Sequence, residues 1–389
     1  MPDTLRVLQA GAGISTAADA RQAGAEAAKR ALEGAGRADG ALVFVGPGYG
    51  DDVSLILDAT AAELGTEVLA GATAHGVLAA GQESEAQAAV AVLAFQGLEA
   101  EAFLVPDPAG EEEAAAEEIV ARLGAPRAED LVVLLPDPGT FDSSALLPAL
   151  GERLGPATLV GAGAGDALGD APLQWCGRSV ATGAISALVL RGTAPPRVGV
   201  TQACRPVTEL LTVTGARGHW ILEIDGRPAL EVFREAAGGA LADDLRRAAQ
   251  FVFVAQPVPG VGGDSLAPGN YLVRHAIGLE EDANAFAIPA EVRPGDRIAF
   301  VFRDAAAARE DLKAMLERVV SPAAVCGLYL NCCARGAGFF GVPGLEAAYL
   351  DRALGPAPVA GMFGSFEIGP IGGVTELLSY TGVLALLEG

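Results

Sequence analysis

Lysine, aromatic residues and cysteine are scarce in this chain of 389 residues, and acidic residues greatly outnumber basic ones. The chain has two lysines, 26 basic and 49 acidic residues in all, and a formal net charge of −23. Nucleic-acid binding needs a basic surface that displaces counterions from phosphates, so we expect no nucleic-acid partner. The same deficit of positive charge argues against binding to an anionic membrane surface.

The sequence also lacks a long uninterrupted apolar run. No stretch of about 18 or more apolar residues is free of charges and glycine clusters, so nothing resembles a transmembrane helix. The segment 1–4 has no basic region followed by an apolar run, so we expect no signal peptide. These features predict a cytoplasmic location and no membrane partner.

Metal and nucleotide motifs are missing as well. The five cysteines show no CxxC spacing, and the three histidines lie far apart, so we expect free thiols and no structural zinc site. GxSxG and P-loop patterns do not occur, and the glycine run 161–165 leads into a hairpin and not a helix. We therefore expect no cofactor, and no complete catalytic set is recognisable.

What the sequence does contain is one order of segments that recurs three times: strand, helix, second strand, glycine turn and closing strand. Strands are predicted at 41–45, 67–70 and 88–94, then at 131–135, 158–160 and 183–190, then at 325–330, 358–360 and 380–387. Gly71 lies 25 residues after Gly46, and Gly161 lies 25 residues after Pro136. Any α/β chain alternates strands and helices, but the equal spacing favours an internal repeat.

The segment 195–320 between the second and third copies has a different pattern. Strands are predicted at 198–203, 219–224, 270–277 and 297–302, and helices at 229–237 and 305–320. We place the main boundary there, with domains 1–197 and 198–389. The predicted class is α/β, with duplicated strand–helix–hairpin units forming mixed sheets with outer helices; a four-layer αββα sandwich is one arrangement that fits.

Several of these segments resemble the FIST family in the right order. The matching stretches are 71–76, 135–138, 161–164, 202–206, 222–230, 332–336 and 361–370. The resemblance covers nearly the whole chain and implies a stand-alone bacterial protein with a FIST N-type domain followed by a FIST C-type domain.

The resemblance also implies a function. FIST domains are regarded as sensory modules in signal transduction, proposed to bind small molecules such as amino acids. No effector domain is recognisable beside them, so any output would pass to a separate partner protein. An animal member of the family is a substrate-recognition F-box protein, which leaves a protein-binding scaffold open as an alternative.

The adjacent residues Cys204 and Arg205 at the domain boundary are the first candidates for a site. A thiol beside a guanidinium can have a lowered pKa and act as a nucleophile. Arg205 could instead bind a ligand carboxylate through two hydrogen bonds. The alternative is structural, with Cys204 as a small core residue and Arg205 paired with an acid.

Cys332 and Arg335 follow the predicted strand 325–330, and ligands of open α/β sheets gather at the carboxyl ends of strands. We expect both to line a cleft there. The alternative is a buried cysteine and an arginine that holds the loop. A redox switch between Cys332 and its neighbour Cys333 is a less favoured hypothesis.

Glu367 stands between apolar residues, shortly after the glycine turn at Gly361. A buried carboxylate needs a partner, and Arg335 or Arg205 is the natural candidate. Such a pair could bind the ammonium and the carboxylate of an amino acid, or it could be purely structural. His75 occupies the corresponding turn of the first copy, and both His75 and Gly361 are included among the candidate ligand-binding residues.

The leading hypothesis is a sensor that binds a small molecule in a cleft between the two halves. The first alternative is an enzyme that uses Cys332 or Cys204 as its nucleophile. The second is a scaffold for a partner protein. Arg274 and His275, on a predicted strand of the middle segment, are weaker candidates for the ligand site.

Overall fold

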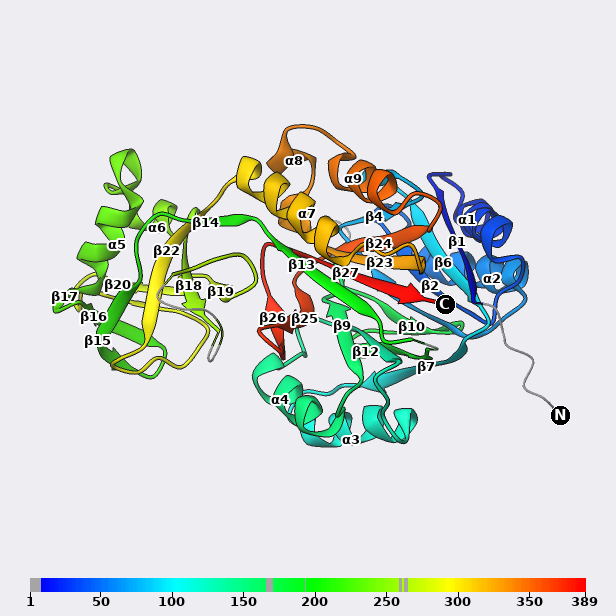
Figure 1. Ribbon diagram of the computed structural model, residues 1–389, viewed down its shortest axis with the longest axis horizontal. Helices are drawn as coiled ribbons and strands as arrows, with labels where there is room; N and C mark the ends of the chain where they lie inside the picture. The colour runs from blue at the N-terminus through cyan, green and yellow to red at the C-terminus, as the bar shows by residue number, and fades with distance from the viewer. Residues whose placement is uncertain (1–7, 166–170, 193, 259–260, 262–264) are drawn as a thin grey trace.

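The structure is a computed structural model that describes residues 8–165, 171–192, 194–258, 261 and 265–389. Three six-stranded sheets form the body of the molecule, and a nine-stranded sheet projects from one side of it (Figure 1). The three sheets of the body are mixed and helices lie outside them, which confirms the predicted α/β class.

The strand orders of the three sheets of the body are as follows. The first sheet runs β1 (Gln9–Ser15), β6 (Val90–Gln96), β2 (Gly40–Val45), β3 (Leu69–Thr73), β10 (Gln174–Cys176), β11 (Ser179–Ala181). The second runs β7 (Glu99–Pro106), β12 (Ala184–Arg191), β8 (Asp130–Pro136), β9 (Thr158–Ala162), β25 (Glu367–Ile371), β26 (Val374–Leu378). The third runs β13 (Arg197–Gln202), β27 (Thr381–Glu388), β23 (Ala324–Cys332), β24 (Val359–Gly364), β4 (Gly76–Ala79), β5 (Gln82–Glu85).

Each sheet combines four strands of its own unit with a hairpin from another unit. The central pairs β2–β3, β8–β9 and β23–β24 are parallel, and the remaining neighbours are antiparallel. The hairpin β10–β11 completes the first sheet, β25–β26 the second and β4–β5 the third. The three units therefore exchange hairpins in a cycle. Descent of the three from one ancestral unit stays a prediction.

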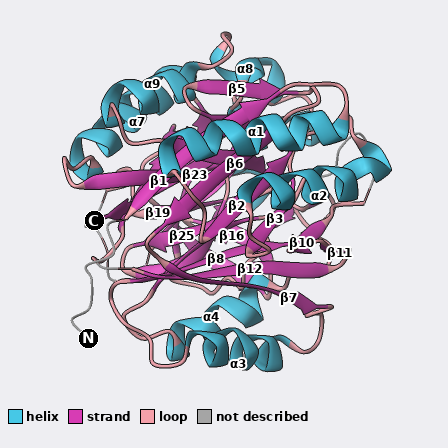
Figure 2. Cartoon of the chain, turned by 90° about the vertical axis from the view of Figure 1, so that its right-hand side faces the viewer, coloured by secondary structure: helices cyan, strands magenta, loops and turns pink. Residues whose placement is uncertain are grey.

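Helices cover the outer faces of the sheets. They are α1 (Ala20–Ala35) and α2 (Val53–Leu64) on the first sheet, α3 (Glu112–Leu123) and α4 (Ser143–Arg153) on the second, and α7 (Ala305–Val319) and α9 (Leu345–Leu354) on the third. The inner faces of all three sheets share one apolar core. Figure 2 shows α1 and α2, α3 and α4, and α7 and α9 around the strands, so each of the three sheets lies between the core and its own pair of helices.

Alanine and glycine let α1 lie directly on its sheet. The buried face of α1 consists of small residues, among them Ala23, Ala27 and Ala31. A Cβ atom built on Gly11 of β1 would lie 1.9 Å from the carbonyl oxygen of Ala31, so no side chain fits between helix and strand. The high content of Gly and Ala thus reflects close packing in this part of the body.

Each hairpin follows a strand of its own unit, and the three segments that connect strand and hairpin meet at the centre of the body. There, each unit donates one backbone hydrogen bond to the next unit. The bonds run from Gly165 N to Thr73 O (2.8 Å), from His75 N to Phe363 O (3.0 Å) and from Ser365 N to Gly163 O (3.0 Å). Thr73 adds a side-chain bond from its Oγ1 to the carbonyl of Gly165, at 2.8 Å. We call these residues the crossing.

Gly71, Gly161 and Gly361 occupy corresponding positions in the three parallel strand pairs, two residues before the crossing. A Cβ atom on Gly361 would lie 1.7 Å from the carbonyl oxygen of Tyr329 on the neighbouring strand. The matching distances are 1.8 Å at Gly71 and 2.3 Å at Gly161. Each glycine therefore allows close approach of the paired backbones, which is an architectural role.

The nine-stranded sheet is built from the segment whose pattern differs from the rest. Its strands are β14 (Cys204–Pro206), β15 (Leu211–Arg217), β16 (Trp220–Ile224), β17 (Arg227–Pro228), β18 (Val252–Pro257), β19 (Tyr271–Arg274), β20 (Gly278–Glu280), β21 (Ala285–Ala287) and β22 (Arg297–Arg303). The helices α5 (Ala229–Ala237) and α6 (Leu245–Ala248) pack on it around Phe233, Phe286 and Phe300. An aromatic cluster with Phe253, Tyr271 and Tyr380 joins this sheet to the body.

The domain boundary at 197/198 stays a prediction. The chain crosses from the body into the nine-stranded sheet between Gln202 and Cys204 and returns after Arg303. The exchanged hairpins, however, tie strands from both sides of residue 197 into the same sheets.

Gly361→Ala should destabilise the protein by about 3 kcal/mol, because its Cβ would force β23 and β24 apart. Urea unfolding followed by circular dichroism measures the change in the free energy of unfolding. Gly338→Ala is the matched control, since its Cβ would meet nothing within 4 Å. Equal stability of the two variants would contradict the architectural role of Gly361.

Candidate functional site

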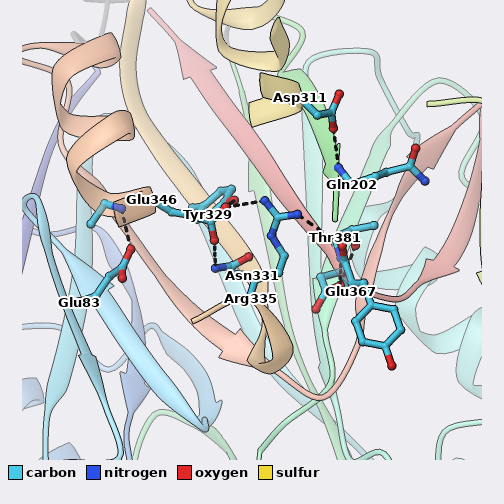
Figure 3. Close-up of polar contacts among 11 residues, drawn as sticks. Glu83, Gln202, Asp311, Tyr329, Asn331, Arg335, Glu346, Glu367 and Thr381 are labelled. Atoms are coloured by element: carbon cyan, nitrogen blue, oxygen red, sulfur yellow. Dashed lines mark hydrogen bonds and ion pairs between the residues drawn. The ribbon is translucent and has the colours of Figure 1, made fainter. Parts of the chain in front are cut away.

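Arg335 lies just beyond the carboxyl end of β23, and its side chain is completely buried. It forms an ion pair with Glu346, in the first turn of α9, at an N–O distance of 2.5 Å. Glu346 also accepts hydrogen bonds from the hydroxyl of Tyr329, at 3.0 Å, and from the amide of Asn331, at 2.5 Å (Figure 3). This network fixes the turn after β23 to the start of α9.

The prediction that Arg335 or Arg205 pairs with Glu367 is wrong. Arg335 forms its ion pair with Glu346, and Arg205 is exposed and forms an ion pair with Asp304 at 2.9 Å. Asp304 is the N-cap of α7, so its pair with Arg205 lies on the surface of the junction. Neither arginine is placed to bind an amino acid together with Glu367.

Glu367 is completely buried on β25, yet only one of its two carboxyl oxygens has a partner. Its Oε2 accepts hydrogen bonds from the hydroxyl and backbone nitrogen of Thr381, at 2.6 and 3.3 Å (Figure 3). Its Oε1 has no hydrogen-bond partner within the described part of the chain. Burial, followed by the nearby Cys332, raises the pKa of Glu367 well above its usual value, which favours the neutral form of the carboxyl.

The thiols of Cys204 and Cys332 are buried in the aromatic cluster that joins the nine-stranded sheet to the body. Burial raises the pKa of Cys204 to about 12. A hydrogen bond to Cys333, together with burial, raises the pKa of Cys332 well above its usual value. Neither thiol is therefore poised as a nucleophile in the folded protein.

Cys333 is the thiol that the sequence reasoning undervalued. It is exposed on the turn after β23, and a hydrogen bond from Cys332 lowers its pKa. The guanidinium of Arg303 lies 5.3 Å from the ring centre of Tyr380 and donates to the carbonyl of Ala334 at 2.6 Å. The signal that could have found Cys333 is its position as the second residue of the adjacent pair, one step beyond the strand.

Tyr380 has a strained backbone at this junction. Its φ of 60° is a conformation that residues other than glycine rarely adopt. Its ring packs against Phe253 and His275, with ring centres 4.6 and 5.2 Å away. The backbone carbonyl of Tyr380 accepts hydrogen bonds from Ala203 N and, at 3.4 Å, from Arg335.

His75 and Gly361 belong to the architecture of the body and not to the junction with the nine-stranded sheet. His75 is half-buried at the crossing, where its Nε2 lies 3.3 Å from the hydroxyl of Ser365. Gly361 packs against the neighbouring strand in β24. The structure thus gathers Cys332, Cys333 and Glu367 near the end of β23 but leaves Arg205, His75 and Gly361 in other surroundings.

A groove of about 1150 Å³ is lined by none of the main predicted site residues, but Arg274, one of the weaker candidates, belongs to it. One wall consists of α4 and the loop that follows it, and another is the hairpin β25–β26. The nine-stranded part contributes Arg274, Pro289 and Ala290. We call this cavity the groove.

Arg274 and Glu376 face each other in the groove, 3.8 Å apart. The side chain of Arg274 is 14% exposed, and the described residues offer its guanidinium one hydrogen bond, 3.2 Å to the carbonyl of Leu377. Burial lowers the pKa of Arg274 and raises that of Glu376. The pair is loose enough to leave donors and acceptors for a ligand.

Glu83 of β5 connects an exchanged hairpin to α9. It accepts a hydrogen bond from the backbone nitrogen of Ala347 at 2.6 Å, at the N-terminal end of that helix (Figure 3). Burial, with further contributions from the nearby Glu346 and Glu85, raises the pKa of Glu83 to about 7. Its protonation therefore changes in the physiological pH range.

Two further geometric features bear on possible partners. Within the described ranges, no group of three or more His, Cys, Asp or Glu side chains is arranged to hold a metal ion. None of the helices in that part of the chain is long and apolar enough to cross a membrane.

Comparison with known proteins gives matches over almost the whole chain. Residues 39–227 match the FIST N domain and residues 229–370 match the FIST C domain. The chain is 35% identical over 393 residues to the uncharacterized protein Rv0628c of Mycobacterium tuberculosis H37Rv, covering 97% of this chain and 99% of that protein. It is 32% identical to the uncharacterized protein Mb0898c of Mycobacterium bovis, covering 97% of this chain and 98% of that protein.

Arg335→Met should lower the free energy of unfolding by about 3–5 kcal/mol, because Glu346 would remain buried without its cation. The double variant Arg335→Met/Glu346→Gln should recover part of this loss. Chemical denaturation of the two variants and the wild type measures both effects. A double variant no more stable than Arg335→Met would contradict the assignment of this ion pair.

The stability contribution of Glu83 should fall as the pH rises. The pKa of Glu83 is about 7 in the folded protein, whereas the ordinary value is 4.5. The folded protein therefore binds this proton more tightly than the unfolded chain does. The resulting stabilisation is complete below pH 4.5 and is lost as the pH rises to 7, by up to about 3 kcal/mol.

Glu83→Gln should remove this pH dependence, whereas Glu63→Gln, at an exposed position on α2, should leave it unchanged. Urea unfolding of the three proteins between pH 4.5 and 7.5 provides the comparison. Parallel pH profiles for the wild type and Glu83→Gln would refute the role of Glu83.

Proposed function

The chain belongs to the FIST family, and on that premise we propose that it is a sensory protein that binds an amino acid or a related zwitterion in the groove. Domains of this family are regarded as small-ligand-binding modules of signal transduction. The observation that carries the proposal is the loose pair Arg274–Glu376 in the wall of the groove.

The chemistry of the groove suits a zwitterion. A guanidinium binds a carboxylate through parallel hydrogen bonds, and a carboxylate binds an ammonium group. Arg274 and Glu376 provide one of each, already partly removed from water, which strengthens their attraction to a charged ligand. This is the recognition scheme expected from the sequence, with Arg274 in place of Arg335 and Glu376 in place of Glu367.

The size of the groove fits a small molecule. Pockets for small ligands usually measure about 300–1000 Å³, and they favour the boundary between two structural units. The groove, at about 1150 Å³, is slightly larger than this range and leaves room for a side chain or a second residue beyond the zwitterionic end. Apolar neighbours such as Leu147 and Val374 would contact that remainder.

The position of the groove supports a sensory role. A ligand that bridged Arg274 and the hairpin β25–β26 would contact the nine-stranded part and the body at once. Binding would favour one relative placement of the two, and a partner protein could read that placement as the signal.

Of the two alternatives, the cysteine enzyme would have to depend on Cys333, because Cys204 and Cys332 are buried with raised pKa values.

Arg274→Gln should weaken the binding of the recognised amino acid by about 10- to 100-fold, the loss expected for charge-assisted hydrogen bonds. Glu376→Gln should weaken it as well. A thermal-shift screen of amino acids and dipeptides identifies the ligand, and calorimetry gives the dissociation constants.

Arg293→Gln is the control, because its side chain is 80% exposed and lies outside the groove. Melting temperatures without ligand show whether each variant is folded. Wild-type affinity in a folded Arg274→Gln protein would refute the proposed groove site, and a flat response across the whole panel would refute amino-acid sensing.

A further inference from the structure

We propose that Cys332 and Cys333 together form a binding site for a thiophilic trivalent centre such as arsenic(III), which both sulfurs bind at once. The two residues are adjacent at the end of β23, where the strand gives way to a turn. This site is separate from the groove, which contains neither residue.

The two cysteines are neighbours in the chain and differ in exposure: Cys333 is exposed, whereas Cys332 is 4% exposed. A hydrogen bond with Cys332 and the nearby positive charge of Arg303 both lower the pKa of the Cys333 thiol. The first bond to an incoming centre would therefore form at Cys333, and the second at Cys332.

Glu367 supplies an independent observation at the same place. Its carboxyl is completely buried, its Oε1 has no hydrogen-bond partner among the described residues, and it interacts electrostatically with both thiols. The proximity of the thiols to this carboxyl raises the pKa of Cys333, and that of Cys332 raises the pKa of Glu367. A free polar atom beside two thiols is what a bound hydroxyl or oxygen of the ligand would contact.

The binding reaction balances without an oxidant or a reductant. With phenylarsine oxide as the ligand, each sulfur forms one bond to arsenic, and the bonds between arsenic and its oxygen break. The oxygen leaves as water together with the two thiol protons. Arsenic remains trivalent, and both sulfurs keep their oxidation state.

The experiment uses the reduced full-length protein and one equivalent of phenylarsine oxide, followed by intact-protein mass spectrometry and peptide mapping. We expect one adduct on the peptide that contains both cysteines. It should survive an excess of 2-mercaptoethanol but be removed by 2,3-dimercaptopropanol, because only a dithiol competes with a two-sulfur chelate. Prior treatment with the arsenical should block alkylation of Cys333 by iodoacetamide.

Three variants separate the outcomes. Cys333→Ser, at an exposed position, and Cys332→Ser should each lose the adduct that resists the monothiol, whereas Cys176→Ser should keep it. Circular dichroism checks the fold of each variant, and Cys333→Ser alone suffices if the buried substitution impairs folding. An adduct that 2-mercaptoethanol strips from the wild type, or equal retention by Cys333→Ser, would overturn the proposal.

Discussion

The crossing of the three hairpins is the constraint on which the body depends. Three backbone hydrogen bonds, each from one unit to the next, close a cycle at its centre. Such a crossing leaves no room for side chains, as Gly165 illustrates: a Cβ atom there would lie 2.5 Å from the backbone nitrogen of His75. Once the backbones cross in this way, each hairpin can pair only with the sheet of a neighbouring unit, and a single core can form between all three sheets.

Much of the local structure followed from the sequence, because periodicity and turn chemistry act over short ranges. The helices predicted at 229–237 and 305–320 and the strand predicted at 131–135 correspond to α5, α7 and β8. The strands β1 and β7 and the helix α3 were missed. The sequence could not predict the exchange of hairpins either. A hairpin with alternating apolar and polar residues can pair with any free edge of a sheet. Which edge it pairs with depends on the direction in which the chain leaves the crossing.

In the candidate site as well, the sequence did not predict which side chains from distant segments would meet. Sequence reasoning recognised Glu367 as a buried carboxylate, but it offered Arg335 or Arg205 as its partner and expected Arg335 to line a cleft. The true partner of Arg335, Glu346, stands in the first turn of a helix, where an acid is usually explained by the helix dipole. Glu367 instead lies near the two thiols with a raised pKa. The charged pair that lines the groove consists of Arg274 on β19 and Glu376 on β26, the strand that pairs with β25.

The exchanged hairpins also have a consequence for synthesis on the ribosome. The hairpin β4–β5 emerges roughly 240 residues before β23 and β24, the strands that its sheet needs. During that interval its edges and apolar face have no partner in the nascent chain, a state that invites non-native pairing and recruits chaperones. Native contacts of such long sequence separation also make for slow folding. The same topology means that a protein cut at residue 197 would leave an incomplete sheet in both halves, because β25–β26 and β4–β5 would be separated from the sheets that they complete.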